Sequence, residues 1–218
     1  MADSKCLSTQ KPSQDVPEWI IVIGSGAGGP QALSQILPEL PVDIPAAVIV
    51  VQYMRPGFTR VLANHLQELC RLPVCEPEDG QALLSSKIVV CPSNARLNVA
   101  RVSFSPIPAY CIHLEDLNDN PELRDSRIDS AMISASEVFG SRTIGVLLTG
   151  LGSDGREGMR AIREAGGLTI AQDQATSVVH ALPSASIEAG VVQEILPLWS
   201  IAERIIETIR GQDNAAAA

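Results

Sequence analysis

The chain has 218 residues, of which 45% are hydrophobic and 19% are charged, and its formal net charge is −9 at pH 7. This length and apolar content are enough for one domain with a single buried core. An acidic chain lacks the clustered lysine and arginine that bind phosphate backbones, so we expect no nucleic-acid partner. No apolar run approaches the roughly 18 residues of a membrane span, and the amino terminus lacks a secretory pattern. We therefore expect a cytoplasmic protein without membrane insertion.

The five cysteines form no C-x-x-C pair, and no histidine joins them at the spacing of a zinc site. We interpret them as reduced packing residues and expect neither a metal nor a cofactor. Residues 1–18 are polar and contain two prolines, which predicts a disordered or extended segment. Residues 19–211 should form the single domain, and residues 212–218 a flexible tail.

Apolar runs typical of buried strands alternate with segments of helical periodicity, which is the pattern of βαβ units and a parallel sheet. The predicted strands are Trp19–Gly24, Ala46–Gln52, Lys87–Cys91, Thr143–Thr149 and Leu168–Gln172. Apolar residues recur at helical spacing within 58–69, 128–139, 159–162 and 201–209. The fold class is thus α/β, with a doubly wound, mostly parallel sheet and helices on both faces.

The stretch from Ala95 to Asn120 departs from this rhythm. Residues 97–104 and 110–114 flank the turn Ser105-Pro106-Ile107-Pro108. We predict an antiparallel hairpin here, appended at one edge of the sheet.

A glycine loop follows the first predicted strand. Gly24-Ser25-Gly26-Ala27-Gly28-Gly29 matches G-x-G-x-x-G, in which amides at Gly24, Gly26 and Gly29 would bind a phosphate. A dinucleotide site also needs an acidic residue at the end of the next strand, but that strand ends in Gln52-Tyr53. Nucleotide or anion binding is therefore a secondary alternative.

In a doubly wound sheet, ligands bind at the carboxyl ends of the strands. Three unusual loops are expected there: 24–29, 52–58 and the glycine-rich 149–155. Asp154 lies at or just before a predicted helix start, where a helix cap would explain it without any chemistry.

Read together, these loops resemble the catalytic domain of the CheB-type chemotaxis protein-glutamate methylesterases. The shared pieces lie at 23–30, 52–58, 145–155 and 171–173, followed by Pro183, and the resemblance covers about residues 19–210. It implies a Ser/His/Asp triad that hydrolyses glutamate methyl esters on chemoreceptors in signal transduction. The family's regulatory receiver domain, part of a phosphorelay, would not fit within residues 1–18, so we expect no receiver domain in this chain.

The catalytic residues depart from the family pattern. The resemblance places the nucleophile at Gly26 and the general base at Tyr53, and only Asp154 is retained. Loss of the serine or histidine in an analogous hydrolase lowers kcat by about 10⁶. The same loops supply the cleft backbone at Ala27, Gly28, Met54, Leu151 and Gly152.

A displaced triad of Ser25, His180 and Asp154 is the alternative that would keep the enzyme active. Without such rewiring, the resemblance implies a pseudoenzyme that acts by binding. We expect its partner to be the cytoplasmic helices of a chemoreceptor or another chemosensory protein, bound through cleft residues such as Tyr53 and Arg55.

Overall fold

The computed structural model of the chain describes residues 16–102, 109–117 and 125–216. A seven-stranded sheet with the order β3-β4-β2-β1-β7-β8-β9 forms its centre, and all of its neighbouring strands are parallel. Its strands are β1 (Trp19–Ser25), β2 (Ala46–Gln52), β3 (Val74–Cys75), β4 (Lys87–Val90), β7 (Thr143–Leu147), β8 (Leu168–Gln172) and β9 (Glu194–Leu196).

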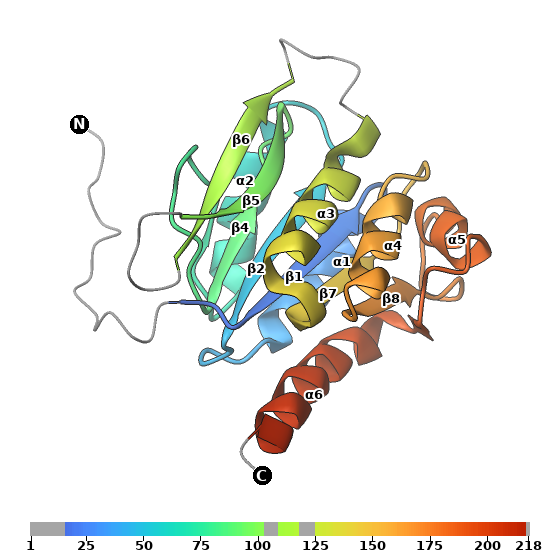
Figure 1. Ribbon diagram of the computed structural model, residues 1–218. Coiled ribbons are helices and arrows are strands. Elements are labelled where there is room, and N and C mark those ends of the chain that lie inside the picture. The colour runs from blue at the N-terminus through green and yellow to red at the C-terminus, as the bar shows by residue number, and fades with distance from the viewer. Residues whose placement is uncertain (1–15, 103–108, 118–124, 217–218) are drawn as a thin grey trace.

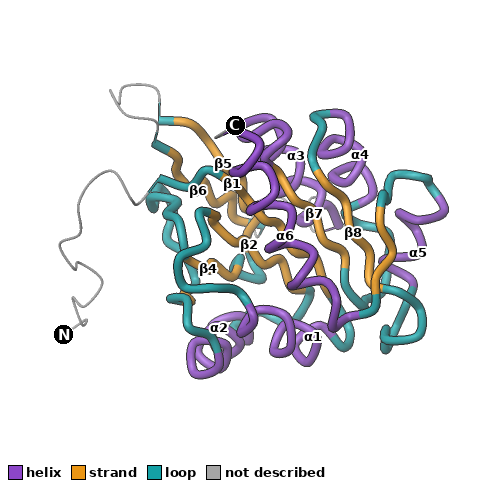
Figure 2. Tube along the Cα trace, turned by 90° about the horizontal axis from the view of Figure 1, so that it is seen from below, coloured by secondary structure: helices purple, strands orange, loops and turns teal. Residues whose placement is uncertain are grey.

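The helices lie on both faces of this sheet. They are α1 (Gly29–Ile36), α2 (Phe58–Leu69), α3 (Arg127–Phe139), α4 (Arg156–Glu164), α5 (Ala181–Glu188) and α6 (Leu198–Ala216). Apolar side chains of α1, α2 and α6 pack on one face, and those of α3 and α4 pack on the other. Figure 2 shows α1 and α2 on one side of the strands and α3 and α4 on the other. The predicted doubly wound α/β fold is confirmed.

Strands β1 and β2 are buried along their whole length. Both are nearly continuous runs of aliphatic residues, as expected for strands covered on both faces. Strand β1 pairs with β2 on one side and with β7 on the other, so the strand order reverses direction at β1. Such a switch point opens a crevice at the carboxyl ends of the strands, which is where the three loops lie.

The predicted hairpin is antiparallel and consists of β5 (Ala95–Arg101) and β6 (Tyr110–Asp116). It forms a separate two-stranded sheet, and Leu97, Val99 and Ile112 pack into the same core cluster as α3. The hairpin therefore covers part of one sheet face beside α3 (Figure 1). The predicted turn, Phe104 included, lies outside the described residues.

Several elements were not predicted. The short edge strands β3 and β9 and the helix α5 carry little apolar periodicity, because only a few of their residues face the core. Helix α1 does bury Ala32, Leu33 and Ile36, but it spans only eight residues. Helix α6 continues through Ala216, so residues 212–216 are helical where we expected a flexible tail. Alanine has the highest helix propensity, which favours this extension. Residues 1–15 of the predicted N-terminal segment lie outside the described part.

Cys70, Cys75, Cys91 and Cys111 are free thiols, as expected for packing residues. Among the helices of the described residues, none is both long and apolar enough to cross a bilayer.

Helices α3 and α4 approach so closely that only glycine fits at one contact. A Cβ atom added to Gly158 would lie 2.5 Å from the Cβ of Met132. In α6, Gly211 has nothing within 4 Å of the same position. We expect Gly158→Ala to lower the free energy of unfolding by about 1–3 kcal/mol through overpacking. Gly211→Ala, the matched control, should raise it by about 0.5–1 kcal/mol, because alanine favours helix.

Urea unfolding of the two variants measures this difference. Equal changes in the two variants would show that the contact between α3 and α4 does not constrain residue 158.

Candidate functional site

Gln52 holds the first two loops together at the carboxyl end of β2. Its side chain is buried and accepts a hydrogen bond from the Ser25 hydroxyl at 2.6 Å. Its amide nitrogen donates to the backbone oxygens of Gly26 and Tyr53, both at 2.8 Å. A Cβ atom on Gly29 would lie 2.0 Å from this side chain, so the loop needs glycine there. The loops are thus fixed from inside the protein.

Gln172 has the same role at the carboxyl end of β8. Its side-chain oxygen accepts from the Thr149 amide, and its nitrogen donates to the Thr176 carbonyl, both at 2.8 Å. The Thr149 hydroxyl in turn donates to the Ala27 carbonyl at 2.9 Å. The carboxyl ends of β2 and β8 therefore each carry a buried glutamine that positions the neighbouring loop.

The Asp154 carboxylate lies where these loops meet the start of α3. Its oxygens accept hydrogen bonds from the amides of Ile128 (2.7 Å), Asp129 (2.9 Å) and Gly155 (2.8 Å). The Tyr53 hydroxyl donates a further hydrogen bond at 2.5 Å. Two of the three amides belong to the first turn of α3. Asp154 therefore caps a helix other than the one that follows it in sequence.

Tyr53 faces Asp154 on one side and Arg127 on another. The Arg127 guanidinium carbon lies 5.4 Å from the centre of the Tyr53 ring, within the range of a cation–π interaction. Burial raises the pKa of Tyr53 well above its usual value, and the negative charge of Asp154 raises it further. The phenol is therefore neutral at physiological pH and acts as a hydrogen-bond donor to Asp154.

A cavity of about 660 Å³ opens beside these groups. It is lined by Gly26, Ala27, Tyr53, Asp125, Leu151, Gly152, Ser153 and Asp154. Of the predicted site residues, the structure thus brings together Gly26, Ala27, Tyr53, Leu151, Gly152 and Asp154. Met54 lines a second pocket, which Tyr53 also lines. Gly28, in the left-handed conformation, precedes α1.

The structure does not join the members of the alternative triad by hydrogen bonds. Ser25 is fully buried, and its hydroxyl donates to Gln52. His180 precedes α5, and its Nδ1 lies 3.4 Å from the Ser177 hydroxyl. The carboxylate of Asp154 is occupied by Tyr53 and three amides. A serine without access to the cavity cannot attack a substrate bound there.

Two backbone amides of the glycine loop form hydrogen bonds within the protein. The Gly26 amide donates to the Thr149 carbonyl and the Gly29 amide to the Gly26 carbonyl, both at 2.9 Å. These two amides are therefore not available to a phosphate. Within the described residues, no cluster of three or more His, Cys, Asp or Glu side chains is arranged to hold a metal ion.

Two residues of this region, Arg127 and Asp125, were missed by sequence reasoning. Asp125 lines both cavities, and Arg127 lines the second. One signal was available for Arg127. Arg127 comes directly before the apolar helical repeat 128–139, so the sequence places a cation at the start of a helix. Helix N-termini disfavour positive charge, so a cation there is unusual and indicates a specific role.

Asp129 caps α4 in the same way that Asp154 caps α3. Its Oδ1 accepts a hydrogen bond from the Gly158 amide at 2.7 Å. Burial raises the pKa of Asp129 to about 6, and the negative charge of Asp154 also raises it, against the opposing effect of the Gly158 hydrogen bond. The two aspartates thus connect α3 and α4 reciprocally.

Removal of the Asp154 carboxylate should destabilise the fold, whether or not the protein is an enzyme. Asp154→Ala would leave the Tyr53 hydroxyl and two α3 amides without their acceptor, so we expect a loss of about 2–4 kcal/mol in unfolding free energy. Asp43→Ala removes an exposed carboxylate and should change stability by less than about 0.5 kcal/mol. Urea denaturation measures both variants, and an equally small effect at Asp154 would contradict its capping role.

Asp129 should make stability depend on pH in a defined direction. Its pKa in the folded protein, about 6, lies above its ordinary value of 3.8. Its contribution is therefore fully present below about pH 4 and is lost as pH rises through about 6. Asp129→Asn keeps an oxygen acceptor for Gly158 and removes the titration. After allowance for solvent screening, we expect the variant to be about 1 kcal/mol more stable than the parent at pH 7.

Urea denaturation of the parent and Asp129→Asn at several pH values between 4 and 7 checks this expectation. A difference between them that stays constant over that range would overturn the pKa assignment.

Comparison with known proteins identifies the family. The family model of the CheB methylesterases matches residues 21–205. Protein-glutamate methylesterase/protein-glutamine glutaminase 1 of Carboxydothermus hydrogenoformans is 43% identical over 190 residues, which cover 87% of this chain and 55% of the relative. The corresponding protein of Pyrococcus horikoshii is 40% identical, with 94% of this chain and 55% of the relative covered. The chain thus spans about half the length of these relatives.

The fold agrees with a solved structure. The CheB methylesterase catalytic domain of Thermotoga maritima has a TM-score of 0.81 to this chain and 36% sequence identity, and the match covers 87% of this chain and 98% of that domain. The parallel sheet, the helices on both faces and the family match therefore lead to one conclusion: the chain belongs to the CheB methylesterase family.

Proposed function

We propose that this chain is a methylesterase-family domain of bacterial chemosensory signalling that binds a chemoreceptor without hydrolysing its methyl esters. The relatives are named protein-glutamate methylesterases, which is the reason to consider receptor glutamates as the target. In this chain, the resemblance to the family places Gly26 at the position of the nucleophile and Tyr53 at the position of the base.

The observation that carries the proposal is the hydrogen bond from the Tyr53 hydroxyl to Asp154. A general base must accept a proton, whereas Tyr53 is a neutral donor whose raised pKa opposes ionisation. Gly26 lines the cavity without a side chain that could attack an ester. The buried position of Ser25 gives no support to a replacement nucleophile.

The cavity itself supports a binding function. Its backbone is held by buried glutamine side chains, and its lining includes an exposed apolar side chain, Leu151, at 69% exposure. Preformed cavities with a few polar groups are typical of ligand sites. The partner is best sought among cytoplasmic receptor helices, in which glutamate residues are the methylated groups of the family's reaction.

Methanol release from methylated chemoreceptor membranes tests the loss of catalysis. We expect no release above a buffer blank from the parent chain, and measurable release from Gly26→Ser/Tyr53→His, which restores both missing groups. A Cβ at residue 26 would lie 3.0 Å from the Cα of Gly150, so the serine requires only a small loop shift. Activity in the double variant should therefore be low but clear. Gly26→Ser alone, which still lacks the base, is the matched control.

Two further readouts separate the alternatives. Cosedimentation of the parent chain with receptor membranes should show binding, which Tyr53→Ala and Arg55→Ala should weaken. Methanol release by the parent, with labelling of Ser25 by a fluorophosphonate probe, would instead establish an active rewired enzyme. Absence of cosedimentation would refute receptor binding.

A further inference from the structure

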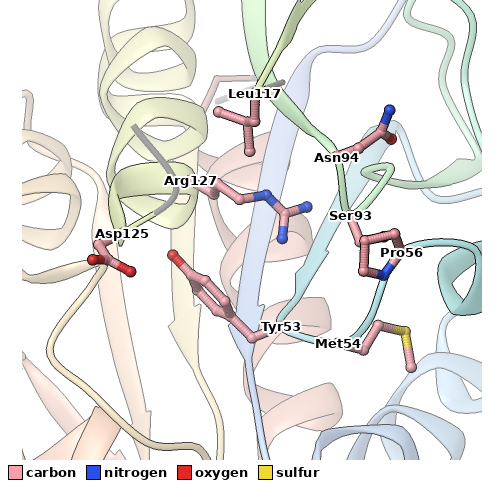
Figure 3. A pocket seen from close by; sticks show the side chains of 8 residues that line it. All are labelled: Tyr53, Met54, Pro56, Ser93, Asn94, Leu117, Asp125 and Arg127. Atoms are coloured by element: carbon pink, nitrogen blue, oxygen red, sulfur yellow. The ribbon is translucent and has the colours of Figure 1, made fainter. Parts of the chain in front are cut away.

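A second pocket adjoins the main cavity at Tyr53. It has a volume of about 270 Å³ and is lined by Tyr53, Met54, Pro56, Ser93, Asn94, Leu117, Asp125 and Arg127. Figure 3 shows the Arg127 side chain extending from the start of α3 into the space between Tyr53 and Ser93. A pocket of this size suits one amino-acid side chain or a small organic acid.

Arg127 is a deeply buried cation, with only 2% of its surface exposed. Its Nε donates to the Ala95 carbonyl at 2.9 Å, and its Nη2 donates to the Pro92 carbonyl at 2.7 Å and contacts the Cys91 sulfur at 3.4 Å. Burial raises the pKa of Cys91, so that this sulfur is a neutral thiol. All three partners are therefore uncharged.

Within the described part of the chain, this cation forms no ion pair. Among residues 16–102, 109–117 and 125–211, no ion pair includes Arg127, although seven other arginine contacts with carboxylates are present. Nη1 donates no hydrogen bond within the same residues. Arg127 is also the first residue of α3, where the helix dipole is positive.

Among the described residues, these features leave a positive charge without an ion-pair partner at the wall of a pocket. Burial of an unpaired cation is unfavourable, and the cation–π contact with Tyr53 offsets only part of that cost. A ligand carboxylate would complete the hydrogen bonding of the guanidinium and neutralise its charge. Charge-assisted hydrogen bonds of this kind are the strong ones in proteins.

We propose that this second pocket binds a carboxylate through Nη1 of Arg127. Met54, Pro56 and Leu117 provide apolar surface for a short aliphatic stem, and Ser93 and Asn94 add polar groups. Asp125 lines the same pocket and disfavours a second negative charge. The ligand is therefore a monocarboxylate on a short stem, of the kind that a glutamate side chain presents. This proposal stands on the surroundings of Arg127 and does not require that a receptor binds.

Two pairs of probes test the chemistry and the source of the carboxylate. The free pair is N-acetylglutamate α-amide and its neutral isostere N-acetylglutamine α-amide. The peptide pair is a helical peptide with one central glutamate and the same peptide with glutamine. Titration of the full chain, followed by two-dimensional NMR, should show each carboxylate binding at least about tenfold more tightly than its neutral isostere.

If N-acetylglutamate α-amide binds more tightly than N-acetylglutamine α-amide, the carboxylate site is supported, and a small molecule can supply the carboxylate. If only the glutamate peptide binds more tightly than its glutamine counterpart, the carboxylate site is supported, and a peptide supplies the carboxylate. If neither carboxylate binds more tightly than its amide, the proposal is wrong. This comparison uses the unmodified chain, so it does not depend on the folding of any variant.

Arg127→Met then tests the residue, because methionine preserves much of the stem and removes the charge. We expect carboxylate affinity to fall at least about tenfold, to the level of the neutral isostere. Arg96→Met is the matched control, since Arg96 contacts α3 at Ser130 without lining the pocket. Unchanged carboxylate affinity in a folded Arg127→Met chain would overturn the proposal. Receptor cosedimentation is a separate measurement, so failure of either proposal leaves the other testable.

Discussion

The carboxylate of Asp154 is the interaction on which the rest of the site depends. It receives hydrogen bonds from Tyr53 and from three backbone amides, two of them in the first turn of α3. This one side chain thereby connects the loop after β7, the loop after β2 and the start of α3. Asp129 completes the connection by capping α4. A negative charge at the start of a helix is stabilising, and here it also fixes the position of the cavity wall.

This arrangement gives Asp154 a structural role that does not depend on catalysis. A serine or histidine that performs only chemistry can be replaced at little cost to the fold. Asp154 differs, because its removal would leave buried donors without an acceptor. Tyr53 suits the remaining requirement, since it supplies a donor to Asp154 and an aromatic face to Arg127. Retention of the aspartate is therefore no evidence of catalysis by itself.

Tyr53 lines both cavities, and the residues around them indicate which chemical groups a ligand of the proposed binding function would carry. The larger one has the glycine loops and Asp154 at its wall, and the smaller one is lined by the buried Arg127, which forms no ion pair among the described residues. Because Tyr53 and Asp125 line both, a ligand that enters one of them contacts groups that are shared with the other. A side chain with a terminal carboxylate is the ligand that we propose for the smaller pocket.

The sequence by itself determined the fold class, because long aliphatic strands such as Ala46–Gln52 and the helical repeats between them allow few arrangements other than a parallel sheet. It also indicated the family, which the comparisons show, and it led to the interpretation that Gly26 and Tyr53 occupy the positions of the nucleophile and the base. Only the tertiary structure decided that Asp154 caps α3, that Ser25 faces Gln52 and that Arg127 is buried beside a pocket. Those facts depend on contacts between segments far apart in the chain, such as Tyr53 and Asp154. No local periodicity or spacing encodes the direction in which these side chains point.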